Sequence, residues 1–172
     1  WYDKVLKKSI YCVDDANYKT IGNQGIEGKK SPLRLYTTTI ADQLQLAQNM
    51  QGKTIGIAIK DRSAILPVGH TANAAYWYDA GNKNQWITSS FYMEELPDWV
   101  KAFNSNNKAD AYLNETWETL YDINTYSQSR ADNNIYENNL NGQEKPVFPK
   151  DLKKLREQND NFSLIKTIPA GN

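Results

Sequence analysis

The sequence predicts an α/β fold, or an α+β fold for the piece taken by itself, and three observations support this. An amphipathic helix pattern begins at a capping box at Thr39 and runs to about Met50. After Gly52 comes a short apolar run, Thr54–Ile59. Helix, tight glycine turn and buried strand make half of a βαβ unit. Two further apolar runs then flank a polar loop, as in a β-hairpin. At 172 residues, the whole chain (1–172) is expected to form a single domain or a fragment of one.

The segment before the helix is predicted to be mostly loop. Residues 14–30 are rich in Gly, Asn and Lys, a composition typical of turns. Ser31 followed by Pro32 resembles a helix cap with proline at the first helical position, so a short helix is expected there. In the main helix, Thr39 and Asp42 have the spacing of a capping box. Its apolar face is predicted from residues that recur at i, i+4 and i+7, namely Ile40, Leu44 and Ala47.

The run Thr54–Ile59 is apolar and rich in β-branched residues, so we predict a strand buried on both faces of a sheet. Residues 31–66 are therefore assigned to a helix–strand piece of an α/β core. Residues 67–172 are assigned to a cap or insert region. Within that region, Ala74–Asp79 and Gln85–Ser89 predict the two strands of the hairpin.

The second half of the chain contains weaker patterns. A helix is expected from Pro97, with an apolar stripe made of Trp99, Val100 and Phe103. Residues 115–121 are expected to be helical and residues 122–146 irregular. Phe148–Gln158 predicts a short helix and Phe162–Ile168 an extended segment. The large share of loop suggests that this half packs against something outside the sequence.

Composition excludes several classes of function. The 20 Lys and Arg residues balance 20 Asp and Glu residues, whereas a nucleic-acid-binding protein usually has a basic surplus or a basic stripe. No apolar run approaches the ~18 residues that a membrane span needs. Cys12 and His70 are the single cysteine and the single histidine. A cysteine-rich zinc site is therefore excluded, and a zinc centre built from this chain alone is not expected.

The candidate site is Lys60-Asp61-Arg62, directly after the predicted strand. In extended chain, residues i and i+2 point to the same side, so Lys60 and Arg62 would face one direction. That place, beyond the carboxyl end of a strand, is where open α/β sheets bind ligands. An Arg fork and a Lys point charge suit phosphoryl oxygens. On spacing alone, the favoured interpretation is that Lys60 and Arg62 are solvated charges at a strand end, with Asp61 as a potential ion-pair partner. His70 is expected to be a structural, hydrogen-bonded residue, because the sequence identifies no partner for a general base.

The run Gly56–Asp79, GIAIKDRSAILPVGHTANAAYWYD, resembles a signature of the monomeric bacterial alkaline phosphatases with a threonine nucleophile. These belong to the type I phosphodiesterase/nucleotide pyrophosphatase branch of the alkaline phosphatase superfamily. Other stretches resemble the family in the same order: Trp1–Asp3, Lys29–Leu46, Trp86–Asn104 and Pro169–Asn172. The resemblance spans the chain, is weaker over about residues 105–160, and implies an internal fragment of such an enzyme.

The resemblance implies a mechanism for the intact enzyme. In the family, two zinc ions are held by Asp and His residues, a threonine attacks phosphorus, and zinc-bound water hydrolyses the phosphothreonine. A Lys and an Arg contact the non-bridging phosphoryl oxygens, and only this role carries over, to Lys60 and Arg62. The nucleophile and the metal ligands have no counterpart in the sequence. The fragment alone is therefore expected to be inactive and to bind no zinc.

The expected substrate is a phosphate monoester, because a dianionic monoester gains more from two cations than a monoanionic diester does. A phosphodiesterase or nucleotide pyrophosphatase segment is an alternative. A second alternative is a non-catalytic ligand-binding module that uses the many aromatic residues, 5 Trp and 11 Tyr. The expected partner is the rest of the chain's own catalytic domain, with no nucleic acid and no membrane span. The family implies a periplasmic or secreted location for the intact enzyme.

Overall fold

The computed structural model describes residues 2–81 and 84–167. Trp1 and Pro169–Asn172, which take part in the family resemblance, lie outside the described residues. The chain divides into two compact units, Trp1–Asn106 and Asn107–Asn172, and each is described by itself. The assignment of residues 31–66 to a core and 67–172 to a cap stays a prediction.

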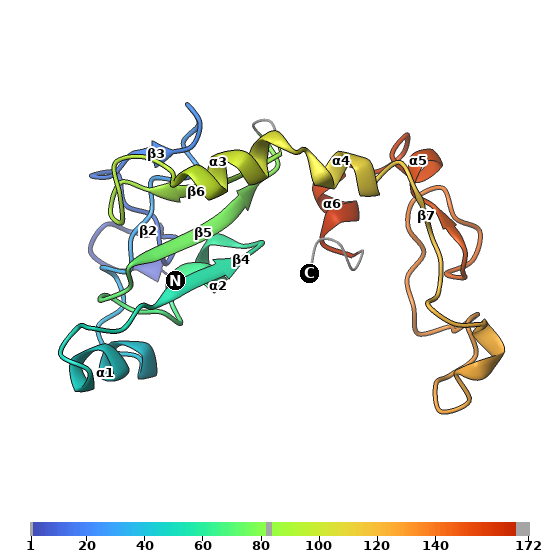
Figure 1. Cartoon of the computed structure of the whole chain (residues 1–172), viewed down its shortest axis with the longest axis horizontal. Helices are drawn as coiled ribbons and strands as arrows, with labels where there is room; N and C mark the ends of the chain where they lie inside the picture. The colour runs from blue at the N-terminus through green and yellow to red at the C-terminus, as the bar shows by residue number, and fades with distance from the viewer. Residues whose placement is uncertain (1, 82–83, 168–172) are drawn as a thin grey trace. The chain divides into compact units, whose positions relative to one another are not determined.

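The first unit is built on a four-stranded mixed sheet, in agreement with the α/β prediction (Figure 1). Its strands, in spatial order, are β3 (Thr20–Ile21), β6 (Gln85–Ser89), β5 (Ala74–Asp79) and β4 (Ile55–Ala58). The predicted hairpin is confirmed, because β5 and β6 pair antiparallel. β5 also pairs in parallel with β4, which places the end of β4 beside a fully buried strand. Two short strands, β1 (Tyr2–Asp3) and β2 (Lys8–Ser9), form a separate ribbon.

The core lies on both faces of β5, whose six residues are all buried. Successive side chains of a strand point to opposite faces. Ala75 and Trp77 therefore pack on one face, in a cluster with Val13, Ile87 and, from α2 (Asp61–Ile65), Ala64 and Ile65. Ala74 and Tyr76 pack on the other face, in a cluster with Leu96 and, from α3 (Asp98–Ser105), Val100. The helix expected from Pro97 is confirmed, with Pro97 at its N-cap.

β4 is shorter and less buried than predicted. It is the last strand of the sheet, and Ile55 and Ile57 are 47% and 60% exposed. The prediction of burial on both faces is therefore wrong for the chain as described. α3 packs over this face of the sheet at β5, through Val100, but leaves the β4 side chains largely exposed. Gly56 faces the other way, and a Cβ there would collide with the backbone carbonyl of Ala64. Only glycine lets α2 pack this closely against the strand.

The amphipathic helix is present as α1 (Ile40–Ala47), and its capping box between Thr39 and Asp42 is confirmed. It ends earlier than predicted, since Asn49 and Met50 have positive φ angles. The predicted apolar face is exposed at Ile40, whereas the residues that α1 buries are polar. No helix forms after Ser31 and Pro32, so that prediction is wrong. The Ser31 hydroxyl instead donates to Asp15 and accepts the Leu33 N–H, which makes a turn.

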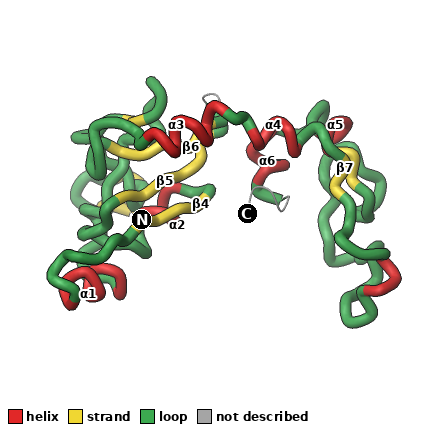
Figure 2. The backbone as a smooth tube through the Cα atoms, viewed as in Figure 1, coloured by secondary structure: helices red, strands yellow, loops and turns green. Residues whose placement is uncertain are grey.

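The second unit has little regular structure (Figure 2). Its elements are α4 (Lys108–Tyr112), β7 (Thr116–Trp117), a 3₁₀ turn (Ile123–Thr125), β8 (Lys150–Asp151), α5 (Leu152–Leu155) and α6 (Asn161–Ile165). Its buried apolar residues are Leu113, Leu152, Leu155, Leu164 and Ile165. The irregular structure predicted for residues 122–146 is confirmed apart from the 3₁₀ turn.

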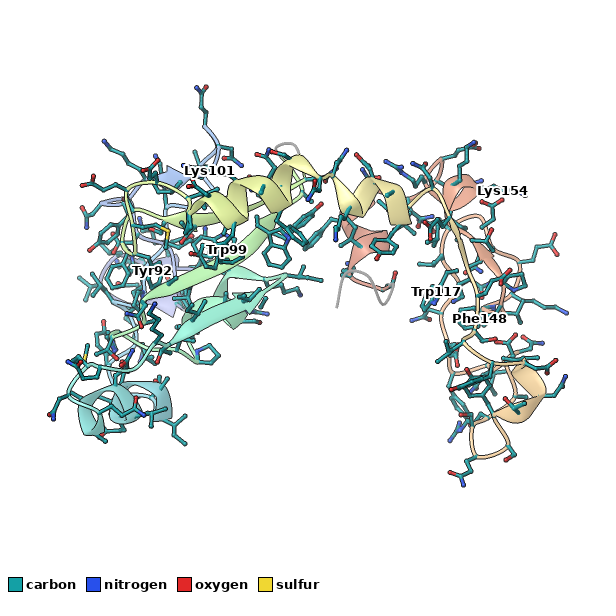
Figure 3. The ribbon with its side chains drawn as sticks, viewed as in Figure 1. Tyr92, Trp99, Lys101, Trp117, Phe148 and Lys154 are labelled. Carbon is teal, nitrogen blue, oxygen red and sulfur yellow. The ribbon has the colours of Figure 1, made fainter. Side chains whose placement is uncertain are left out.

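Two predictions in this unit are wrong. Residues 115–121 are not helical, because β7 pairs antiparallel with β8. The Trp117 ring stands edge-on to Phe148, with centroids 4.9 Å apart, and both are labelled in Figure 3. The segment predicted to be extended, Phe162–Ile168, is helical up to Ile165, because the Asp160 side chain caps α6 through the Ser163 N–H. Ile168 lies outside the described residues. The helix predicted over Phe148–Gln158 is reduced to α5.

Candidate functional site

Lys60 and Arg62 lie where β4 ends and α2 begins. Lys60 is the N-cap of α2 and keeps an extended backbone, while Arg62 is already helical. The predicted extended geometry through all three residues is therefore wrong. Both side chains are exposed. Within the described ranges, neither charged group makes a hydrogen bond or an ion pair, so both cations remain available at this strand end.

The backbone changes direction here because α2 starts immediately. The N–H groups of Ser63 and Ala64 both donate to the Lys60 carbonyl. Asp61 turns its carboxylate back onto the chain, and its Oδ1 accepts the Arg62 N–H at 2.6 Å. Arg62 therefore follows Lys60 within one tight turn at the carboxyl end of β4, the usual place for ligand binding in α/β sheets.

The Asp61 carboxylate also contacts two residues that are distant from it in sequence, Tyr11 and Lys30. The Tyr11 hydroxyl donates to Asp61 Oδ1 at 2.7 Å. Lys30 Nζ lies 3.7 Å from Asp61 Oδ2, and the same ammonium donates to Asp14 at 2.6 Å. Burial and the hydrogen bond to Asp61 raise the pKa of Tyr11 well above its ordinary value, so its hydroxyl stays a donor. Sequence analysis missed these contacts, because nothing local marks them.

His70 takes part in a hydrogen-bonded cluster around Asp42, as predicted for a structural histidine. Asp42 is 1% exposed and accepts the backbone N–H groups of His70 and Thr71 at 2.8 and 2.9 Å. The His70 ring nitrogen Nδ1 lies 3.5 Å from Asp42 Oδ2. Burial would raise the pKa of Asp42, but the hydrogen bonds from Thr39, Thr71 and His70 outweigh burial and hold it well below its ordinary value.

An apolar pocket of about 160 Å³ opens between α3 and the sheet of the first unit. It is lined by Ile57, Tyr76, Trp86, Trp99, Val100 and Phe103. Trp99, labelled in Figure 3, stands edge-on to Tyr76 with ring centroids 5.4 Å apart, yet remains 57% exposed. The stripe of Trp99, Val100 and Phe103 is confirmed as a feature of α3, but only Val100 is buried.

The described residues do not fit a zinc site. Among them, no group of three or more His, Cys, Asp or Glu side chains is arranged to hold a metal ion. In the same part of the chain, no helix is long and apolar enough to cross a membrane.

No protein-family model matches the chain, but individual relatives match nearly all of it. The chain is 43% identical over 172 residues to alkaline phosphatase PhoV of Synechococcus elongatus, covering 100% of the chain and 31% of that protein. It is 41% identical over 174 residues to alkaline phosphatase PafA of Elizabethkingia meningoseptica, again covering 31% of that protein. A Myroides odoratus protein named calcium-transporting ATPase is 50% identical over 165 residues, and 30% of it is covered. The chain thus spans about a third of these relatives.

Solved structures agree with these matches. The crystal structure of PafA superposes on the whole chain with a TM-score of 0.85 at 39% identity, and the chain covers 33% of it. A PafA variant superposes with a TM-score of 0.86 at the same identity. That variant carries substitutions of a threonine, an asparagine, a lysine and an arginine, and the lysine and arginine are two positions apart. Over its whole length, this chain is therefore similar in sequence and in fold to about a third of bacterial alkaline phosphatases such as PhoV and PafA.

Proposed function

We propose that the intact protein is a phosphate monoester hydrolase of the alkaline phosphatase kind, and that Lys60 and Arg62 contact the phosphoryl oxygens of its substrate. The observation that supports this most is the pair itself. Both charged groups are exposed at the carboxyl end of β4, and neither is engaged in a hydrogen bond or ion pair with another described residue.

A second Lys–Arg pair in the chain provides a comparison that also supports Lys60 and Arg62 as the phosphate contacts. Lys154 and Arg156 have the same spacing as Lys60 and Arg62. Arg156, however, is already engaged, with a 2.8 Å ion pair to Asp110. The lysine and arginine substituted together in PafA have this spacing too. Lys60 and Arg62 match that pattern with both charged groups still available.

The chemistry of the two side chains suits phosphoryl transfer. A guanidinium binds two oxygens in a fork, and an ammonium adds a compact charge. Both stabilise the negative charge on the equatorial oxygens of the transferring group. A monoester dianion gains more from this pair than a diester monoanion does, which favours monoesterase over phosphodiesterase or nucleotide pyrophosphatase activity.

We infer that zinc ions and the attacking threonine belong to parts of the enzyme outside this chain. The threonine and the asparagine substituted in PafA precede its lysine by more positions than this chain has before Lys60. The described residues also do not fit a metal site. No step is therefore assigned to a metal here, and Lys60 and Arg62 act only by binding and charge stabilisation. We propose a periplasmic or secreted location for the intact enzyme.

The partner of the chain is the rest of its own catalytic domain. Parallel strands are usually buried on both faces, yet Ile55 and Ile57 on β4 are largely exposed. Trp99 and Phe103, which line the same pocket as Ile57, are also exposed. Because about two thirds of the length of the relatives lies outside this chain, that missing part is the proposed cover for this apolar surface.

The test is kcat/KM of the intact parent enzyme for a phosphate monoester and the matching diester, before and after the joint change Lys60→Ala plus Arg62→Ala. Monoester kcat/KM is expected to fall by about 10²–10³, the effect of removing an oxyanion donor, while diester kcat/KM falls much less. A loss below about threefold for both substrates contradicts the proposed role. An equal loss for both favours the phosphodiesterase or nucleotide pyrophosphatase alternative.

A matched control is available on α5. Lys153 and Lys154 are exposed, and within the described residues their ammonium groups make no hydrogen bond or ion pair. Lys153→Ala plus Lys154→Ala removes the same two charges from the second unit. Both activities should stay within about twofold of the parent, because neither lysine is proposed to contact the phosphoryl group and exposed charges are screened by salt.

A further inference from the structure

The carboxylate of Asp61 stands between the two proposed phosphate contacts but is withdrawn from solvent. Its side chain is 15% exposed, whereas Lys60 and Arg62 are both exposed. A free carboxylate in this place would be the nearest anion to both cations. It would compete with a phosphate for them, because an Arg fork binds a carboxylate as well as a phosphate.

Asp61 already has other partners for both of its oxygens. Oδ1 accepts both the Tyr11 hydroxyl at 2.7 Å and the Arg62 backbone N–H at 2.6 Å. Oδ2 faces the Lys30 ammonium at 3.7 Å. Both oxygens are thus engaged by groups other than the Lys60 ammonium and the Arg62 guanidinium. The burial that raises the pKa of Tyr11 also favours its neutral, donating form.

Lys30 is itself firmly held, so it provides a fixed anchor. Its side chain is 9% exposed, and its ammonium lies 2.6 Å from Asp14 and 4.0 Å from Glu27. The same ammonium lies 5.4 Å from the centre of the Tyr11 ring, a cation–π contact. The backbone on either side is tied down as well, since Asp14 and Lys30 form a β-bridge. Asp14 and Glu27 are 52% and 53% exposed, but the Lys30 ammonium is buried, so removing its partners would leave a buried charge uncompensated.

We propose that Tyr11 and Lys30 are positioning residues that hold the Asp61 carboxylate away from Lys60 and Arg62 and so keep both cations free for the phosphoryl group. This inference rests on the proposed function of Lys60 and Arg62. Neither Tyr11 nor Lys30 touches the substrate, and their effect on turnover passes through the Lys60–Arg62 segment. The contacts of Tyr11 and Lys30 with Asp61 also explain how an acidic residue can stand between two residues that bind a phosphate.

The test is a double-mutant cycle in the intact parent enzyme with a phosphate monoester as substrate. Tyr11→Phe and Lys30→Met are each measured in the parent and in the Lys60→Ala plus Arg62→Ala background. In the parent, Tyr11→Phe removes one oxygen, and kcat/KM is expected to fall about three- to tenfold, as for one lost hydrogen bond. In the background without the two cations, the same change should alter kcat/KM by less than about 1.5-fold, because coupled residues are non-additive.

Two controls separate positioning from general destabilisation. Tyr18→Phe removes a tyrosine hydroxyl that makes no hydrogen bond to another described residue, and its ring instead stands edge-on to Phe91. It should leave kcat/KM within about 1.5-fold in both backgrounds. Lys30→Arg keeps the charge and should recover most of the activity that Lys30→Met loses. If Lys30→Met yields no folded enzyme, Tyr11→Phe decides the question.

The outcomes distinguish this inference from the proposed function. If the Lys60→Ala plus Arg62→Ala change leaves monoester turnover unaffected, both are overturned. If that change is damaging but Tyr11→Phe lowers kcat/KM equally in both backgrounds, or in neither, the positioning role is overturned and the proposed function stands. A loss confined to the parent background supports both.

Discussion

The buried carboxylate of Asp42 accepts the backbone N–H of His70 at 2.8 Å, across 28 positions of sequence. The same carboxylate accepts from Thr39 and Thr71, so it joins the start of α1 to the loop that leads into β5. A capping residue predicted to act locally thus also fixes a tertiary contact. Because β5 pairs with β4, this contact helps to place the strand that ends at Ala58, two residues before Lys60.

Asp42→Asn is expected to destabilise the intact protein by about 2–3 kcal/mol, because hydrogen bonds to a buried charged acceptor are stronger than neutral ones. Denaturant unfolding would measure the change. Asp98→Asn is the matched control, since the Asp98 side chain is fully exposed. Its effect should stay below about 0.5 kcal/mol. Equal effects of the two changes would contradict the role given to Asp42.

Stability should also depend on pH through Asp42. Its pKa in the folded protein lies below the ordinary value, so the unfolded state binds the proton more readily. The contribution of Asp42 is therefore complete above about pH 5 and is lost as the pH falls below the unfolded pKa of about 3.9 toward the folded one. The stability difference between parent and Asp42→Asn should narrow from pH 5 to pH 2.5. A constant difference over that range would be the contrary result.

Gly69→Ala tests the contact between Asp42 and the His70 loop from the loop side. Gly69 has a φ of +73°, and an added Cβ would collide with the Asp42 carboxylate. The cost is expected to be about 1–3 kcal/mol, from backbone strain and displaced hydrogen bonds. At Gly81 the nearest atom to an added Cβ is 3.4 Å away, so Gly81→Ala should cost less than about 0.5 kcal/mol. Thermal unfolding of the two variants side by side would decide between them.

Because one face of β4 is exposed in residues 1–172, a polar substitution there should destabilise the intact protein more than residues 1–172 alone. Ile57→Asn should destabilise the intact protein by about 1.5–3 kcal/mol, because burying an aliphatic side chain contributes that much. In residues 1–172 alone, where Ile57 is 60% exposed, the same change should cost less than about 0.5 kcal/mol. Similar costs in both contexts would show that the missing part of the protein does not cover this face.

Local patterns predicted the elements whose determinants lie close together in sequence. The capping box at Thr39, the β5–β6 hairpin and the helix after Pro97 all follow from neighbouring residues. The cap of α6 is also local, because Asp160 lies three positions before Ser163, although the apolar run that follows Asp160 favours a strand.

The remaining differences between the predicted and the observed structure come from long-range contacts, which a local sequence pattern does not indicate. The edge position of β4 depends on which strands pair, and its composition is that of a central strand. The helical start at Asp61 overturned the extended geometry expected for Lys60 and Arg62, although both remain exposed at the strand end. The bond from Tyr11 to Asp61 spans 50 positions, and no local spacing indicates it.

The most direct measurement of the central claim is competitive inhibition of the intact enzyme by inorganic phosphate, before and after Lys60→Ala plus Arg62→Ala. Inorganic phosphate presents the same oxygens as the substrate without any ester group. If Lys60 and Arg62 contact those oxygens, the inhibition constant should rise at least about tenfold, the effect of losing one hydrogen bond to a charged group. An inhibition constant within about twofold of the parent value, with the Lys153→Ala plus Lys154→Ala control also unchanged, would contradict phosphate contact by this pair.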